Sequence, residues 1–175
     1  MPEQGVSDGG TDARAEYCEF ATARAKQLFR VAFLMCGDWH EAEDLVQITL
    51  AKLFVAWNRV RRQDSVEAYA RKVMVNAFLS QRRLRRSSEL PTGDLAESIS
   101  PGVDADLRLT LVAALQQLPP RSRAVVVLRY VDDHSIESVA GLMGTTPAAV
   151  KSLNTRGLAQ LRELLVGEQQ ELFQR

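Results

Sequence analysis

Apolar residues recur every three or four positions through most of this 175-residue chain. This period places apolar side chains along one face of a helix, whereas a half-buried strand needs alternation at every second residue. Three consecutive valines at 125–127 have strand character, but no second segment has a pattern that could pair with them. The sequence therefore predicts an all-α fold, with helices over 20–36, 39–57, 70–86, 107–118, 121–130, 135–143 and 147–165.

Composition divides these helices into two groups. Residues 89–107 hold five acidic side chains and no basic one, and two prolines and two glycines interrupt any helix there. The first residues of the chain are rich in Gly, Asp, Ser and Thr and show no periodicity. We therefore expect two small helical domains over 16–88 and 107–166, a flexible linker over 89–106, a disordered N-terminus over 1–15 and a C-terminal tail over 167–175.

The reactive residues form no recognisable catalytic or metal-binding group. Cys18, Cys36, His40 and His134 lack the spacing of a metal site, and no nucleophile motif or glycine-rich phosphate loop is present. No apolar run approaches the ~20 residues that a membrane span needs, and the N-terminus has no secretory pattern. We expect a cytoplasmic protein that is not an enzyme and needs no cofactor or metal.

The strongest local pattern is a short helix, a Gly-Thr-Thr turn and a longer helix over residues 135–162. This order is typical of a helix-turn-helix, whose second helix enters the major groove of DNA. Many helical hairpins share the pattern. Here, however, the face opposite the apolar stripe holds small and hydrogen-bonding side chains, which favours DNA binding by Ala148, Lys151, Ser152, Thr155 and Arg156.

A second polar face lies on the helix expected over 70–86. A merely solvated face normally mixes charges, whereas this one holds donors and no acidic residue, which favours nucleic acid. Its members are Arg71, Lys72, Asn76, Ser80, Arg82 and Arg83.

A third polar group, Glu43, Asp44 and Gln47, lies near the start of the second expected helix. The positive end of the helix macrodipole stabilises acidic residues there, which explains the acids without a function. The alternative is a polar face that docks another protein.

Four stretches of residues 16–166 are distinctive when they are taken in order. They are Gly37-Asp38 with residues 42–47 (AEDLVQ), residues 68–76 (AYARKVMVN) with the arginines that follow, residues 118–125 (LPPRSRAV), and Val150-Lys151-Ser152 with Arg156. Together they resemble the extracytoplasmic-function sigma factors of bacteria, small initiation factors of RNA polymerase in the sigma-70 family. The resemblance implies a first domain that binds the polymerase clamp and melts the −10 element. It also implies a helix-turn-helix domain that recognises the −35 element.

The resemblance also assigns roles to residues. It implies that Glu43, Asp44 and Gln47 bind the clamp helices of RNA polymerase core, and that the helix-turn-helix face binds the −35 element near the polymerase flap. It adds Arg61 and Arg62, from a loop expected over 58–65, to the −10 face. Promoter DNA and polymerase are the expected partners, with an anti-sigma factor as a further candidate and a monomeric free chain.

Two other functions fit parts of this pattern. A stand-alone helix-turn-helix regulator would explain the C-terminal domain, but it would leave residues 19–88 unexplained. A sigma antagonist that binds only protein would not need the donor face of the third helix. The charges favour the sigma-factor interpretation, because residues 19–88 carry 13 basic and 7 acidic side chains and are followed by an acidic linker.

Overall fold

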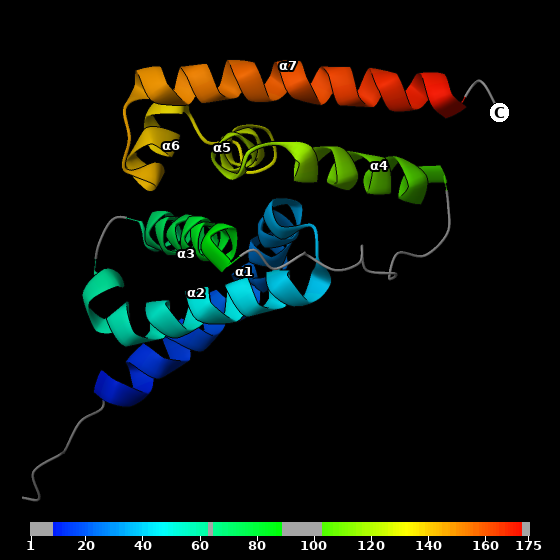
Figure 1. Ribbon diagram of the computed structural model, residues 1–175. Coiled ribbons are helices and arrows are strands. Elements are labelled where there is room, and N and C mark those ends of the chain that lie inside the picture. Colours follow the sequence, from blue (N-terminus) through cyan, green and yellow to red (C-terminus); the bar gives the residue numbers. More distant parts are fainter. Residues whose placement is uncertain (1–8, 63–64, 89–102, 173–175) are drawn as a thin grey trace, which may run out of the picture.

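The computed structural model describes residues 9–62, 65–88 and 103–172, and in this part of the chain all regular structure is helical (Figure 1). The predicted all-α fold, with a helix-turn-helix in its C-terminal half, is confirmed. The helices are α1 (Gly9–Cys36), α2 (Trp39–Val60), α3 (Val66–Ser88), α4 (Val103–Gln117), α5 (Pro120–Tyr130), α6 (Ile136–Met143) and α7 (Pro147–Leu172).

Residues with short polar side chains cap the starts of α2, α6 and α7, where the sequence predicts them. Asp38 accepts a hydrogen bond from the backbone N–H of Glu41 at 2.8 Å. Ser135 caps α6 by accepting from Ser138 N at 3.0 Å, and Thr146 caps α7 by accepting from Ala149 N at 3.2 Å. These bonds satisfy backbone donors that have no partner inside the helix.

Several helices are longer than the sequence pattern predicts. The helix α1 begins at Gly9, so residues 9–15 are helical rather than disordered, and Ala13 is buried. The helix α2 continues through Val60, three residues into the expected loop, because Trp57 and Val60 both lie in the core. The helix α4 begins inside the expected linker, and α7 continues into the expected tail.

The helices form two units that pack against each other. Helices α1–α3 make the N-terminal unit and α4–α7 make the C-terminal unit (Figure 1). Across the boundary, α1 contacts α4 and α5, and α3 contacts α5 and α6. Buried side chains of both units, including Met35, Phe78, Leu118 and Leu128, form one continuous core. Each such side chain contributes about 1.5–3 kcal/mol when buried, so this contact is a substantial part of the fold.

Candidate nucleic-acid and protein interfaces

The first candidate surface is the start of α7. Its apolar residues Val150 and Leu161 are buried against the rest of the C-terminal unit. The short α6 precedes it and ends at Gly144, whose φ of 60° makes the tight turn. All five residues that the sequence predicts for DNA binding lie on the exposed side of α7, namely Ala148, Lys151, Ser152, Thr155 and Arg156.

The second candidate surface is on α3. Lys72, Asn76, Ser80 and Arg83 are exposed and follow one another at about one turn of helix. The sequence thus places these four side chains on a common outer face, as the structure has them. Donors at this spacing can contact successive phosphates or base edges of one nucleic-acid strand.

Arg71 and Arg82, which the sequence also assigns to this surface, bind groups of the protein itself. Arg71 is 5% exposed and forms an ion pair with Asp132. Arg82 donates to the carbonyl of Cys36 at 2.9 Å and to a carboxylate oxygen of Glu41 at 2.8 Å. Arg71 is buried and Arg82 is partly buried, and both guanidinium groups are engaged with partners of the protein in this arrangement.

The two arginines of the expected loop, Arg61 and Arg62, also differ in exposure. Arg61 forms an ion pair with Glu16 of α1 at 2.7 Å, and only 19% of its side chain is exposed. Arg62 is exposed. The expected loop over 58–65 is shorter in the structure because α2 continues to Val60, and residues 63–64 lie outside the described part.

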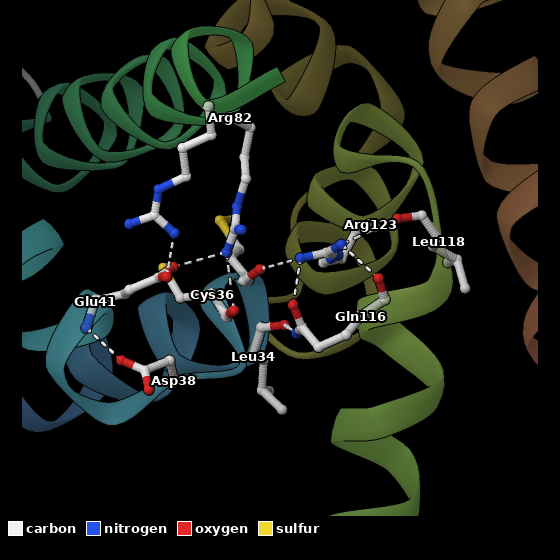
Figure 2. A network of polar contacts seen from close by, with 10 residues as sticks. Leu34, Cys36, Asp38, Glu41, Arg82, Gln116, Leu118 and Arg123 are labelled. Atoms are coloured by element: carbon white, nitrogen blue, oxygen red, sulfur yellow. Dashed lines mark hydrogen bonds and ion pairs between the residues drawn. The ribbon is translucent and has the colours of Figure 1, made fainter. Parts of the chain in front are cut away.

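The C-terminal end of α1 is capped by side chains from both units (Figure 2). Arg123 of α5 donates to the carbonyl of Met35 at 2.7 Å and to the carbonyls of Gln116 and Leu118 at 2.8 and 3.1 Å. The bond to Met35 and that of Arg82 to Cys36 satisfy carbonyls that α1 leaves unpaired and place positive charge at its negative end, whereas the other two bonds satisfy carbonyls at the end of α4. Burial lowers the pKa of Arg123 to about 10, so the guanidinium stays charged at neutral pH.

The sequence pattern does not identify Arg123 as a structural residue. The available signal was a charged side chain beside the apolar run that starts at Ala124, which is unusual in a helix with a buried face. Its acceptors lie up to 88 residues away in sequence, so no local pattern could identify them.

A second polar group surrounds Asp132, in the turn between α5 and α6. His134 lies 2.9 Å from Asp132 through Nε2 and 3.0 Å from Ser138 through Nδ1. This order of side chains resembles a hydrolase triad, but the carboxylate is also held by Arg71 and Gln27, and the serine lies on the exposed start of α6. The group therefore connects the two units and has the environment of a structural contact.

A cleft of about 590 Å³ separates the two candidate DNA surfaces. Asn76, Ser80 and Arg83 of α3 line one wall, and Leu153 and Arg156 of α7 line the other. Three exposed residues of the α3 face and one residue of the α7 face, Arg156, therefore border one cleft.

The third candidate surface is on α2. Glu43, Asp44 and Gln47 are exposed, and Glu43 accepts a hydrogen bond from the indole of Trp39 at 2.9 Å. Val55 lies two to three turns further along the same side and is 87% exposed. A polar edge followed by an exposed apolar side chain is the composition of a protein-binding surface.

The described residues were also compared with what a metal site and a membrane span require. No three His, Cys, Asp or Glu side chains come together there in a way that could hold a metal ion. None of the helices in the described ranges combines the length and the apolar character that crossing a membrane requires.

Comparisons with known proteins give the family. The model of sigma-70 region 2 matches residues 20–88, and that of sigma-70 region 4 matches residues 108–161. The RNA polymerase sigma-E factor of Streptomyces coelicolor is 37% identical over 155 residues, which cover 86% of both chains. The chain belongs to the extracytoplasmic-function sigma factors. The resemblance predicted from the motifs is confirmed, and this sigma factor is a transcription initiation factor and not an enzyme.

Further relatives agree with this assignment. The sigma factor SigE of Mycolicibacterium smegmatis is 30% identical over 175 residues, covering 95% of this sigma factor and 68% of the relative. Among solved structures, the sigma factor RpoE of Bartonella quintana in complex with the anti-sigma factor NepR has a TM-score of 0.71. It is 24% identical and covers 86% of this chain and 96% of the other. This likeness shows that the helices share one arrangement.

Proposed function

We propose that this sigma factor binds RNA polymerase core through α2, the −10 element through α3, and the −35 element through α7. The observation that supports this most directly is that one chain carries two exposed donor faces, one in each sigma-70 region, and a separate polar face on α2. A stand-alone helix-turn-helix regulator needs neither the α3 face nor the α2 face.

The polymerase contact is proposed for Glu43, Asp44 and Gln47, with Val55 as its apolar continuation. Side chains at 44, 47 and 55 lie on one face of α2. Exposed carboxylates at the edge of the surface attract basic partners, whereas desolvation of Val55 supplies affinity. The clamp helices of the polymerase are the proposed partner.

The −35 contact is proposed for Ala148, Lys151, Ser152, Thr155 and Arg156. The small side chain of Ala148 lets the first turn of α7 approach the bases. Arg156 and Lys151 can each donate to a guanine edge, and a bidentate pair is worth about 1–3 kcal/mol of discrimination. The hydroxyl groups of Ser152 and Thr155 suit phosphates or either kind of base edge.

The −10 contact is proposed for Lys72, Asn76, Ser80 and Arg83, together with Arg62. Arg61, Arg71 and Arg82 could join it only after giving up the ion pairs described above. We place this activity in the cytoplasm, where polymerase and promoter DNA are found, with a monomeric free chain. An anti-sigma factor is a further proposed partner, since the solved structures similar to this chain include a sigma factor in complex with the anti-sigma factor NepR.

Run-off transcription with purified core polymerase on genomic templates tests the proposal. We expect Asp44→Ala or Gln47→Ala to weaken competition for core, whereas Glu19→Ala, which removes an exposed acid from α1, should leave competition unchanged. Equal competition by all variants would refute the α2 surface.

Permanganate footprinting of the holoenzyme separates promoter binding from melting. Arg156→Ala should weaken closed-complex binding, whereas Asn76→Ala should reduce melting. Arg162→Ala, on another side of α7, is the matched control for Arg156. A reversed pattern, with Asn76→Ala abolishing closed complexes, would overturn the assignment of the two faces.

A further inference from the structure

The cleft between α3 and α7 is lined by positive charge and by no carboxylate. Four of its lining residues are arginines, and none is Asp or Glu. Arg82 is paired with Glu41 of α2. Arg121 of α5 and Arg156 of α7 are exposed, and neither forms an ion pair in the described part of the chain. Their guanidinium groups are therefore available to an anion that enters the cleft.

The first turn of α5 lines the same cleft. Pro119, at the N-cap, supplies no side-chain hydrogen bond, and Pro120 has no N–H to satisfy. The N–H of Arg123 makes the first backbone bond of the helix, to the carbonyl of Pro119 at 2.9 Å. The N–H groups of Arg121 and Ser122 come before that bond and have no acceptor within the helix. Such donors at the positive end of a helix favour phosphate and other anions.

Ser122 adds a buried hydroxyl to this part of the cleft. The residue lines the cleft although it is only 5% exposed. None of the hydrogen bonds within the described ranges involves its hydroxyl group. Because a buried hydroxyl normally has a partner, the cleft beside Ser122 suits a ligand that brings a hydrogen-bond acceptor.

Another part of the lining is apolar. Leu79 of α3 and Leu153 of α7 are half-buried, and Met143 of α6 is buried. The volume of about 590 Å³ lies within the range of small-molecule sites, which combine apolar walls with a few polar groups. An inorganic ion would leave the apolar walls without contacts. The lining therefore suits an anionic group that is attached to an apolar body.

We propose that this cleft binds a small organic phosphate with an aromatic body, which is the chemistry of a nucleotide. Arg121, Arg156 and the first turn of α5 bind the phosphate groups, since guanidinium groups and helix N-termini both match phosphate oxygens. Leu79, Met143 and Leu153 contact the aromatic body. Guanidinium planes also stack on aromatic rings, which favours a base over an acyl chain.

The site itself does not depend on the proposed function, but it has a consequence for it. Asn76, Ser80 and Arg156 line the cleft and are also proposed to contact promoter DNA. A nucleotide in the cleft and promoter DNA therefore compete for these side chains, which gives this sigma factor a small-molecule input. Only this consequence rests on the proposed function.

Isothermal titration calorimetry of the full-length free chain with ADP tests the site, at low salt and without DNA or polymerase. We expect saturable binding of one ADP. Inorganic phosphate lacks the base and adenosine lacks the phosphates, so each should bind at least about tenfold more weakly than ADP. Absence of saturable binding, or equal affinity for ADP and either fragment, would overturn the proposal. Tighter binding of laurate, a carboxylate on an acyl chain, would also overturn it.

Substitutions locate the bound ADP. Arg121→Met should weaken ADP binding about tenfold, because a charge-assisted hydrogen bond is lost from an exposed residue whose removal leaves the helices intact by circular dichroism. The matched control is Lys151→Met, which removes an exposed positive charge from α7 that does not line the cleft. Its affinity for ADP should equal that of the wild type.

Equal weakening by Arg121→Met and Lys151→Met would mean that ADP is attracted to the basic surface in general, and the site would be refuted. Failure of the proposed function is distinguishable from failure of the site. It would show as no run-off transcription by the wild-type holoenzyme, whereas the titration contains neither polymerase nor DNA.

Discussion

Replacement of Arg123 by Met tests the physical account of the contact between the two units. Arg123 is 4% exposed and donates to three main-chain carbonyls, those of Met35, Gln116 and Leu118. Met fills similar volume but leaves these acceptors without a donor, at about 1–3 kcal/mol each. Removing a buried charge offsets part of that loss. We expect the free energy of unfolding to fall by about 2–4 kcal/mol.

Urea unfolding followed by circular dichroism measures this change, and thermal scans should show a midpoint lower by about 4–16 °C. The control is Arg121→Met, because Arg121 is exposed on the same helix and should alter stability by no more than about 0.5 kcal/mol. If Arg123→Met and Arg121→Met have the same stability, the hydrogen bonds to α1 and α4 contribute nothing and the argument is wrong.

Three further predictions concern other parts of the fold. Gly157→Ala should destabilise the chain, because a Cβ there would lie 2.9 Å from Val126 Cγ2. Overpacking costs about 1–3 kcal/mol, which exceeds the ~1 kcal/mol that Ala gains over Gly in helix propensity. Urea unfolding curves measure the net change. A thiol reagent should label Cys18 in the native chain and reach Cys36 only on unfolding, since burial raises the pKa of Cys36 to about 12. Burial alone would raise the pKa of Asp132, but Arg71 and His134 outweigh it and the pKa lies below 3.8. Its contribution to stability is therefore complete above about pH 4 and lost as pH falls through the lowered value. The loss of unfolding free energy caused by Asp132→Asn, measured in urea, should be constant from about pH 5 to 8 and shrink only in acid.

The helices and their starts could be predicted from sequence because both depend on local chemistry. Apolar spacing identifies the buried side of each helix, and Asp38, Ser135 and Thr146 act on backbone donors only three residues away. The exposed side chains of α7 follow from the same period. Helix ends were less predictable, since burial of Val60 and Ala13 extends α2 and α1 beyond their patterns.

The pairing between the units could not be predicted in this way. Arg71 and Asp132 are 61 residues apart, and Arg71 shares its sequence neighbourhood with exposed donors such as Lys72. A guanidinium on the flank of a helix can bind phosphate or a carboxylate equally well. Only the three-dimensional arrangement, which brings the turn after α5 to α3, decides between those partners.

The hydrogen bonds at the end of α1 form late while the chain is being synthesised. The carbonyl of Met35 has no donor from Arg123 until the ribosome has added that residue, 88 positions later in the chain. At about 5–20 residues per second, that interval is roughly 4–18 s. During this time the end of α1 and the apolar surface beside it lack their later partners. A nascent N-terminal unit therefore meets chaperones and proteases in a less protected form than the finished chain, and only completion of α5 ends that exposure.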